Sequence, residues 1–355
     1  MNAAQQPTLM RIPMRTLSHQ TRYALEGVDD ILVYKIAMTT RFRGVTCREG
    51  LLLHGHAGWG EAAPFWNYGD LESSRWLAAA LESARRFPPV PRRKFVPVNV
   101  TIPVISPEEA YERVKASGGC ATAKIKVAEP GVSVGRDCAR IAAVADALRE
   151  TVGGQAMIRL DANGAWEVDQ AREAIPAMAA AAGVVPIEYV EQPCASVEEL
   201  AELRRRLDGM VAIAADESIR RAADPLRVRE LGAADVVVLK VQPLGGAAAC
   251  LDLAERLEIP VVVSSAVETS VGLEAGLRLA AALPELPFAC GLETGRLLAR
   301  DVTVHPLLSV AGEIEVHTVH VDAELVEACR ADARTERWWL DRLQRVAAVA
   351  GVTLP

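Results

Sequence analysis

The stretch at residues 156–166 reads Ala-Met-Ile-Arg-Leu-Asp-Ala-Asn-Gly-Ala-Trp. Its apolar run ends abruptly in a carboxylate, Asp161, and a glycine turn and a helix-like segment follow. This order is typical of a strand that leads into a loop and then into a helix. It predicts that a strand delivers Asp161 to the mouth of a loop.

The same pattern recurs along the chain, where further short apolar runs carry or end in polar residues. Those polar residues are Lys124 and Lys126 upstream, and Glu191, Asp216, Lys240, Ser264 and Ser265 downstream. From Lys126 the steps are 35, 30, 25, 24 and 24 residues, and each step has room for a strand, a helix and two short loops. We therefore predict a parallel βα repeat closed into a barrel, with the active site at the C-terminal ends of the strands.

Composition limits the class of protein. The chain has 355 residues, so one barrel of about 250 residues leaves roughly 100 for a second domain. The net charge of −7 argues against nucleic acid as the main partner. Seven cysteines without a C-x-x-C pair are typical of reduced thiols in a cytoplasmic protein, and no apolar stretch approaches membrane-spanning length. A small molecule is the expected partner, and a monomer and a homo-oligomer both remain open.

The domain organisation follows from local patterns. Apolar runs at 31–38 and 51–56 around a polar turn at 39–44 predict a hairpin, and 71–85 has helical spacing. The proline-rich stretch at 87–93 is a stiff connector between domains. We predict a poorly ordered polar lead, an α+β domain, the barrel, and a C-terminal segment that packs on both domains, at 1–21, 22–93, 94–296 and 297–355.

Three carboxylates are expected to converge at the mouth of the barrel. Asp161, Glu191 and Asp216 end three successive strands, and neighbouring strands lie about 4.8 Å apart. These carboxylates would repel each other unless a cation lay between them. Oxygen ligands alone favour Mg²⁺, with Mn²⁺ as a substitute, over zinc.

Lysines flank these acids on both sides. Lys124 and Lys126 are two residues apart, so they face the same side of their strand, and Lys240 would stand on the opposite side of the metal. Nearby positive charge depresses the pKa of a lysine from its reference of about 10.4, so Lys124 would lower the pKa of Lys126 and also bind a substrate carboxylate. Lysine bases around a carboxylate-bound metal suit abstraction of a proton α to a carboxylate, because the metal stabilises the enediolate.

With these motifs the chain resembles the enolase superfamily. The matching residues are Lys124-x-Lys126, Asp161-Ala-Asn163, Glu191-Gln-Pro193, Asp216-Glu-Ser218 and Lys240. The three lysines, with serines instead of a histidine on the seventh strand, resemble the muconate lactonizing enzyme subgroup. The resemblance implies an α/β fold: a (β/α)7β TIM-like barrel with an N-terminal α+β capping domain that the C-terminal tail completes. The stretch 58–64 is similar to that capping domain.

Within the subgroup, the chain is most similar to the actinobacterial o-succinylbenzoate synthase family, through the stretches 40–48, 239–246 and 263–273. The resemblance implies a lyase of menaquinone biosynthesis. Its reaction is the Mg²⁺-dependent syn dehydration of 2-succinyl-6-hydroxy-2,4-cyclohexadiene-1-carboxylate to 2-succinylbenzoate, through an enediolate.

The resemblance also implies roles for individual residues. Lys126 would act first as the base and then as the acid for the departing hydroxyl, and Lys240 would stabilise the enolate. The residues implied to line the substrate pocket are Ser264, Ser265 and Gly291 for the succinyl arm, with Phe42 and Arg43 reaching in from the capping domain. Asn163 and Glu217 would lie behind the metal ligands. Because Glu217 follows Asp216 directly, we expect it to point to the opposite face of the strand.

Other functions remain open on the same residues. An N-acylamino acid racemase, a dipeptide epimerase and a muconate cycloisomerase use the same machinery. Dipeptide epimerases carry Asp-x-Asp after the last strand, where this chain reads Gly-Leu-Glu-Thr-Gly at 291–295. A non-catalytic barrel that only binds a partner is the alternative from a different class, and a missing lysine or acid would favour it, but all are present.

Overall fold

The computed structural model describes residues 11–42 and 44–350. The first ten residues of the predicted lead lie outside this part of the chain. From Arg11 onward the prediction of poor order is wrong, because the segment forms a 3-10 turn, η1 (Met14–Thr16), and helix α1 (His19–Ala24). Ile12 and Leu17 are buried against the first domain, and that apolar contact holds the segment in place.

The N-terminal domain is a three-stranded antiparallel sheet that packs on helix α2 (Asp70–Arg85). Its strands are β1 (Val28–Phe42), β2 (Val45–Gly55) and β3 (Gly58–Ala62). The predicted hairpin is thus extended by a third strand. The polar turn predicted at 39–44 is also wrong over 39–42, because β1 continues to Phe42, which pairs with Val45.

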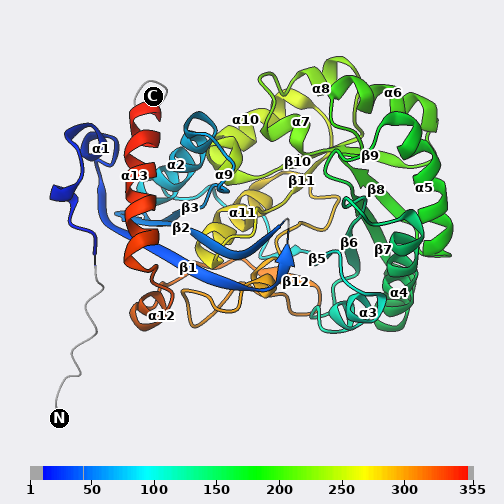
Figure 1. The fold of residues 1–355 in the computed structure, drawn as a ribbon, viewed down its shortest axis with the longest axis horizontal. Coiled ribbons are helices and arrows are strands. Elements are labelled where there is room, and N and C mark those ends of the chain that lie inside the picture. Colours follow the sequence, from blue (N-terminus) through cyan, green and yellow to red (C-terminus); the bar gives the residue numbers. More distant parts are fainter. Residues whose placement is uncertain (1–10, 43, 351–355) are drawn as a thin grey trace, which may run out of the picture.

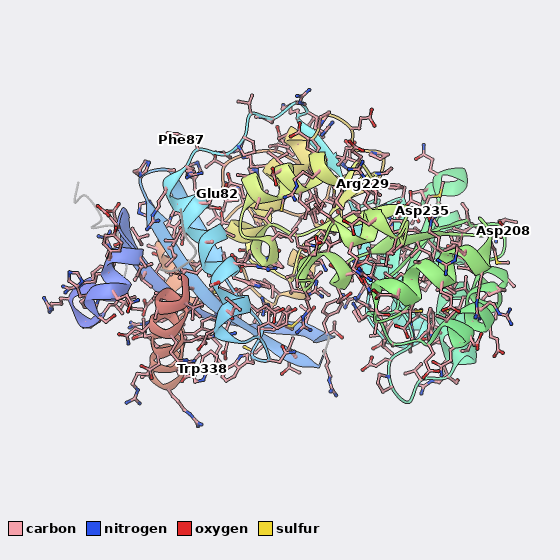
Figure 2. The ribbon with its side chains drawn as sticks, turned by 90° about the horizontal axis from the view of Figure 1, so that it is seen from above. Glu82, Phe87, Asp208, Arg229, Asp235 and Trp338 are labelled. Atoms are coloured by element: carbon pink, nitrogen blue, oxygen red, sulfur yellow. The ribbon has the colours of Figure 1, made fainter. Side chains whose placement is uncertain are left out.

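A connector joins the two domains. The chain leaves α2 near Phe87 and crosses to the barrel (Figure 2). There β4 (Phe95–Pro97) pairs antiparallel with β12 (Glu313–Glu315) from the C-terminal segment, outside the barrel sheet. The stretch at 95–102 therefore forms two strands, and only the second enters the barrel.

The barrel sheet has seven hydrogen-bonded parallel strands in sequence order (Figure 1). They are β5 (Asn99–Ile102), β6 (Thr122–Lys126), β7 (Met157–Asp161), β8 (Ile187–Glu191), β9 (Ala212–Ala215), β10 (Val236–Leu239) and β11 (Val261–Val263). The long helices that follow these strands are α3 (Pro107–Lys115), α4 (Val134–Val152), α5 (Val168–Ala182), α6 (Val197–Leu207), α10 (Ala247–Leu257) and α11 (Ser270–Ala282). Short pieces are η2 (Gly153–Gln155), α7 (Glu217–Arg220), α8 (Arg227–Glu230) and α9 (Val241–Leu244).

The segment at 288–291 closes the barrel. It makes parallel bridges to both edges of the sheet, Val98 with Cys290 and Ser264 with Gly291. The Asn99 amide donates to the Cys290 carbonyl at 2.9 Å, and the Gly291 amide donates to the Val263 carbonyl at 2.8 Å. The sequence-based prediction of a (β/α)7β barrel with a capping domain is confirmed.

The C-terminal segment returns to the cap. After η3 (Gly295–Leu297) and β12, the helical part of this segment is split into α12 (Ala323–Ala328) and α13 (Ala333–Ala350). The split arises because residues between them bond to the edge of β1: the Lys35 amide donates to the Cys329 carbonyl, and the Ala331 amide donates to the Val33 carbonyl. Helix α13 then lies beside α1 and α2, so the tail completes the cap (Figure 1).

Candidate active site

The strand register places the charged residues side by side at the mouth of the barrel. Lys126 on β6 is in register with Asp161 on β7, and Asp161 is in register with Glu191 on β8. Asp216 and Lys240 each stand one residue beyond β9 and β10. All five are buried, although each carries a charge in its ionised form. Burial of so many charges is costly unless they are paired.

Each acid of this group meets a lysine. Lys126 Nζ contacts Asp161 and donates to Asn163 Oδ1 at 2.8 Å. Lys240 Nζ donates to Asp216 Oδ2 at 2.7 Å. Lys124 Nζ lies 3.2 and 3.1 Å from the two carboxylate oxygens of Glu191. The structure thus brings together the three lysines and three acids that the sequence singled out.

The electrostatic balance differs among the three acids. Burial raises the pKa of Asp161, but Lys126 and Lys124 outweigh burial and hold that pKa below its usual range. Burial and the repulsion of Asp161 raise the pKa of Glu191 to about 7 despite Lys124. Burial opposes the charge on Lys124, but its two acidic neighbours outweigh burial and raise its pKa. Lys124 therefore remains a cation.

The donor set fits a hard divalent cation in the type of its ligand atoms. Three buried carboxylates from consecutive strands supply oxygen atoms only, which suits Mg²⁺. Because burial, together with Asp161, raises the pKa of Glu191 to about 7, a further cation beside this acid would stabilise its charged form. In the part of the chain that the structure describes, no three His, Cys, Asp or Glu side chains form a ready cluster, and the carboxylate oxygens of this group face the lysines.

One expectation about the neighbouring residues is wrong. Asp216 is the N-terminal cap of α7, so the backbone has already left the strand at Glu217, and strand alternation no longer applies. Glu217 Oε1 accepts from Asn163 Nδ2 at 3.3 Å and also contacts Arg220. Glu217 therefore faces the site instead of the opposite face of a strand.

Arg220 is a site residue that the sequence analysis missed. Its Nε donates to Asp216 Oδ1 at 3.0 Å, and its Nη1 donates to the Tyr68 hydroxyl at 2.6 Å. Burial raises the pKa of Asp216, but Arg220 and Lys240 outweigh burial and hold that pKa below its usual range. The spacing of four residues between Asp216 and Arg220 would have indicated the contact if a helix had been expected there.

A small cavity of about 20 Å³ is lined by Lys124, Lys126 and Lys240. The predicted pocket residues Phe42, Ser264, Ser265 and Gly291 all line it, whereas Arg43 lies outside the described residues. A Cβ at Gly291 would collide with Ser264, so this position has room only for glycine. The other lining residues, which the sequence analysis missed because they carry no charge, are Phe65, Thr101, Ala266, Val267 and Thr294.

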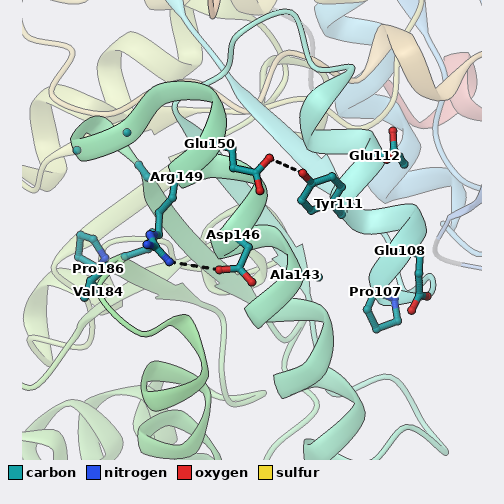
Figure 3. A pocket seen from close by; sticks show the side chains of 14 residues that line it. Pro107, Glu108, Tyr111, Glu112, Ala143, Asp146, Arg149, Glu150, Val184 and Pro186 are labelled. Atoms are coloured by element: carbon teal, nitrogen blue, oxygen red, sulfur yellow. Dashed lines mark hydrogen bonds and ion pairs between the residues drawn. The ribbon is translucent and has the colours of Figure 1, made fainter.

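A larger hollow of about 810 Å³ lies on the flank of the barrel (Figure 3). We call it the flank groove; its polar lining includes Tyr111, Asp146, Arg149 and Glu150 from α3 and α4. The Tyr111 hydroxyl and the Arg149 guanidinium point to acids on α4, and none of the mouth residues lines this groove. The chemistry therefore belongs to the small cavity.

Two family models match the chain. The model for the enolase N-terminal domain-like family matches residues 33–84, and that for the enolase C-terminal domain-like family matches residues 107–320. A relative described as o-succinylbenzoate synthase from Thermobifida fusca (strain YX) is 55% identical over 89% of this chain and 95% of its own length. One of the same name from Mycobacterium tuberculosis (strain ATCC 25618 / H37Rv) is 48% identical over 89% of this chain and 93% of its own length.

Solved structures support the same fold. The muconate lactonizing enzyme from Pseudomonas fluorescens, complexed with muconolactone, aligns with a TM-score of 0.71 at 19% identity over 86% of this chain and 99% of its own. The L-Ala-D/L-Glu epimerase from Bacillus subtilis aligns with a TM-score of 0.68 at 23% identity over 82% of this chain and 96% of its own. At such identities these likenesses establish the fold alone. Among the described residues, the helices are too short or too polar to cross a membrane.

Proposed function

The chain belongs to the enolase superfamily, and on that premise we propose that it is an o-succinylbenzoate synthase, a lyase. The reaction is the syn dehydration of 2-succinyl-6-hydroxy-2,4-cyclohexadiene-1-carboxylate to 2-succinylbenzoate, a step of menaquinone biosynthesis. The observation that carries this proposal is that Lys126 and Lys240 contact two different acids among the three buried carboxylates at the mouth of the barrel. The chain that carries them is 55% identical to a relative of that name.

Lys126 performs the proton transfers. As a neutral amine it takes the proton from the ring carbon that bears the carboxylate, and it becomes an ammonium ion. It then gives this proton to the departing hydroxyl, which leaves as water, and the amine is regenerated. One side chain serves both steps because the proton and the hydroxyl leave from the same face of the ring.

Lys240 and Lys124 act as cations. Lys240, held by Asp216, stabilises the negative charge that develops on the substrate carboxylate after proton abstraction. Lys124 contributes to binding that carboxylate, and its raised pKa keeps it charged. Ser264, Ser265 and Gly291 line the space for the succinyl arm.

Enolase-superfamily enzymes generally use Mg²⁺, and we propose that Asp161, Glu191 and Asp216 hold it in this chain, with Mn²⁺ as a substitute. When bound, the cation supplies positive charge beside the substrate carboxylate. Asn163 and Glu217 lie next to these three acids, and the hydrogen bond from Asn163 to Glu217, at 3.3 Å, helps to hold the acids in place. The proposed location is the cytoplasm, which the seven unpaired cysteines support.

N-acylamino acid racemisation is the second candidate. The paired contacts of Lys126 with Asp161 and of Lys240 with Asp216 would allow a proton to move on either face of a substrate. Dipeptide epimerisation is disfavoured, because Glu293 after the last strand is tied to Arg296 and to the Ser309 amide.

A deuterium experiment separates the two reactions. With substrate deuterated at the carbon that bears the carboxylate, a dehydratase should release deuterium to solvent through Lys126, and Lys240→Arg should keep part of the turnover because it keeps the cation. The measurement is mass spectrometry of 2-succinylbenzoate and NMR of solvent exchange. If instead Lys240→Arg blocks exchange from one enantiomer of an N-acylamino acid and spares the other, racemisation is the reaction.

A further inference from the structure

The loop between β3 and α2 reaches the active site at two points. We call residues 63–69 the cap loop. Phe65 lines the small cavity, and the Tyr68 hydroxyl accepts from Arg220, which in turn donates to Asp216. The cap loop thus contacts both the substrate pocket and the group that orients a proposed metal ligand.

One side chain from the far end of the sequence fixes this loop. Arg342 on α13 donates through Nη1 to the Pro64 carbonyl at 3.1 Å. Its Nη2 donates to the carbonyls of Phe65 at 2.9 Å and Tyr68 at 2.8 Å, and to Ser73 Oγ at 2.9 Å. The planar fork of a guanidinium is suited to hold several acceptors in one fixed arrangement.

Aromatic contacts add to this attachment. The ring of Trp66 in the cap loop stacks on Trp338 of α13, with ring centres 4.1 Å apart. The Arg342 guanidinium lies 5.2 Å from the ring centres of both Trp338 and Trp339. Figure 2 shows Trp338 on α13 at the side of the cap. The contact between helix and loop is therefore extensive and not a single bond.

The environment of Arg342 is unusual for a charged residue. It is 2% exposed, and burial lowers its pKa to about 10. Among the described residues no carboxylate lies within ion-pair distance of it; its acceptors are three neutral carbonyls and a hydroxyl. A buried cation without a counter-ion is a poor source of stability. Its geometry instead specifies the conformation of one loop.

We propose that Arg342 is a positioning residue of the active site. It fixes the cap loop, and through that loop it holds Tyr68 against the Arg220–Asp216 pair and Phe65 against the substrate pocket. Arg342 touches neither substrate nor metal. In this inference, the identities of the substrate and of the metal rest on the proposed function.

Four variants test this proposal: Arg342→Lys, Arg342→Met, Tyr68→Phe, and Arg337→Met as the matched control. Arg337 lies on the same helix but is exposed, and it donates to the Ala333 carbonyl of its own helix. The readouts are Mn²⁺ binding to the substrate-free protein, followed by electron paramagnetic resonance, and separate kcat and KM values for dehydration. Circular dichroism reports the fold of each variant.

Tyr68→Phe should weaken Mn²⁺ binding by about 3- to 10-fold, with little change in KM. This is at or below the low end of the range for direct partners of metal ligands, because Tyr68 acts on Asp216 through Arg220. Arg342→Lys and Arg342→Met should weaken Mn²⁺ binding by about 3- to 10-fold and also raise KM severalfold, because they release Tyr68 and Phe65 together. Arg337→Met should change neither quantity. The effects of Arg342→Lys and Tyr68→Phe on Mn²⁺ binding should be non-additive in the double variant, because they act on one path.

A folded Arg342→Lys protein with wild-type Mn²⁺ binding and KM would overturn the proposal, as would equal losses in Arg337→Met or additive effects in the double variant. If Arg342→Met does not fold, Arg342→Lys and Tyr68→Phe decide the question. A wild-type protein that binds no Mn²⁺ would overturn the proposed metal site and this inference together. A wild-type protein that binds Mn²⁺ without dehydration would overturn only the proposed reaction, and the Mn²⁺ titrations would still test Arg342.

Discussion

The mouth of the barrel and the flank groove contain the same chemical groups in opposite settings. At the mouth, the Lys124–Glu191 pair has side chains 7% and 1% exposed, beside a cavity of about 20 Å³. On the flank, the Lys115–Glu150 pair has side chains 38% and 54% exposed, beside a hollow of about 810 Å³. The charges beside the larger hollow are more exposed and therefore interact more weakly. The position of the active site is thus indicated by buried charge and not by the volume of a hollow.

Water explains the difference. An exposed ion pair is screened by water and contributes little to stability. Hydrogen bonds from Tyr111 and Lys115 lower the pKa of Glu150, as expected for an acid with partners and free access to solvent. Burial and Asp161 instead raise the pKa of Glu191 to about 7. A cation bound at the mouth would therefore stabilise the charged form of Glu191, whereas the charged form of Glu150 on the flank is already stabilised by its two partners.

The largest expected difference between the two regions concerns their lysines. Lys126→Ala should lower kcat for dehydration by about 10⁴-fold or more, because one residue supplies both proton transfers, each worth about 10²–10⁴-fold. Lys115→Ala, the matched change on the flank, should leave kcat unchanged and alter stability by about 0.5 kcal/mol or less. The measurement is the loss of diene absorbance, with circular dichroism to verify folding. Near-normal turnover in Lys126→Ala would show that the base is wrongly assigned.

The second largest effects are expected from removal of the metal and from substitutions of the acids. Removal of divalent ions should abolish turnover, and Mg²⁺ should restore it. Asp216→Asn should weaken Mg²⁺ binding beyond the ~10–100-fold typical of outer partners, Glu217→Gln should fall within that range, and Glu150→Gln on the flank should have no effect. Isothermal titration with Mg²⁺ measures all three. Full activity in a metal-free preparation would contradict the metal assignment.

The sequence predicted the barrel and the charged group well for a physical reason. Strand-end residues such as Asp161 and Glu191 are positioned by local alternation and by a regular repeat, and both are visible in one chain. Asp216 and Glu217 were less predictable, because the chain enters a helical turn right after β9. Local patterns carry no signal for such a departure from the strand.

Contacts between segments far apart in the sequence could not be predicted. Arg342 reaches Pro64 across 278 positions of sequence, and Arg220 reaches Tyr68 across 152. Phe65 is an ordinary apolar residue until the packing of the cap brings it to the pocket. These partners are chosen by tertiary packing, so neither periodicity nor spacing identifies them.

A smaller difference between buried and exposed acids is expected in the pH dependence of stability. Burial, together with the charge of Glu61, raises the pKa of Glu268 from 4.5 to about 8. Between these values the folded protein binds more protons than the unfolded chain, so this group makes stability fall as pH rises from about 4.5 to about 8. Glu268→Gln should flatten that decline in Tm. Glu150→Gln should leave it unchanged, because the lowered pKa of Glu150 places its effect below this window.

Tm measured across the same pH range for the three proteins provides the comparison. If the wild-type protein and Glu268→Gln show the same slope, Glu268 does not titrate in this window.

The most direct test of the central claim offers one purified preparation two substrates in the presence of Mg²⁺. These are the succinyl-hydroxycyclohexadiene carboxylate and a single enantiomer of an N-acylamino acid. We predict efficient conversion of the first to 2-succinylbenzoate, with a higher kcat/KM than for any racemisation of the second, and loss of both activities in Lys126→Ala. Efficient racemisation without aromatisation of the diene would contradict the proposed reaction.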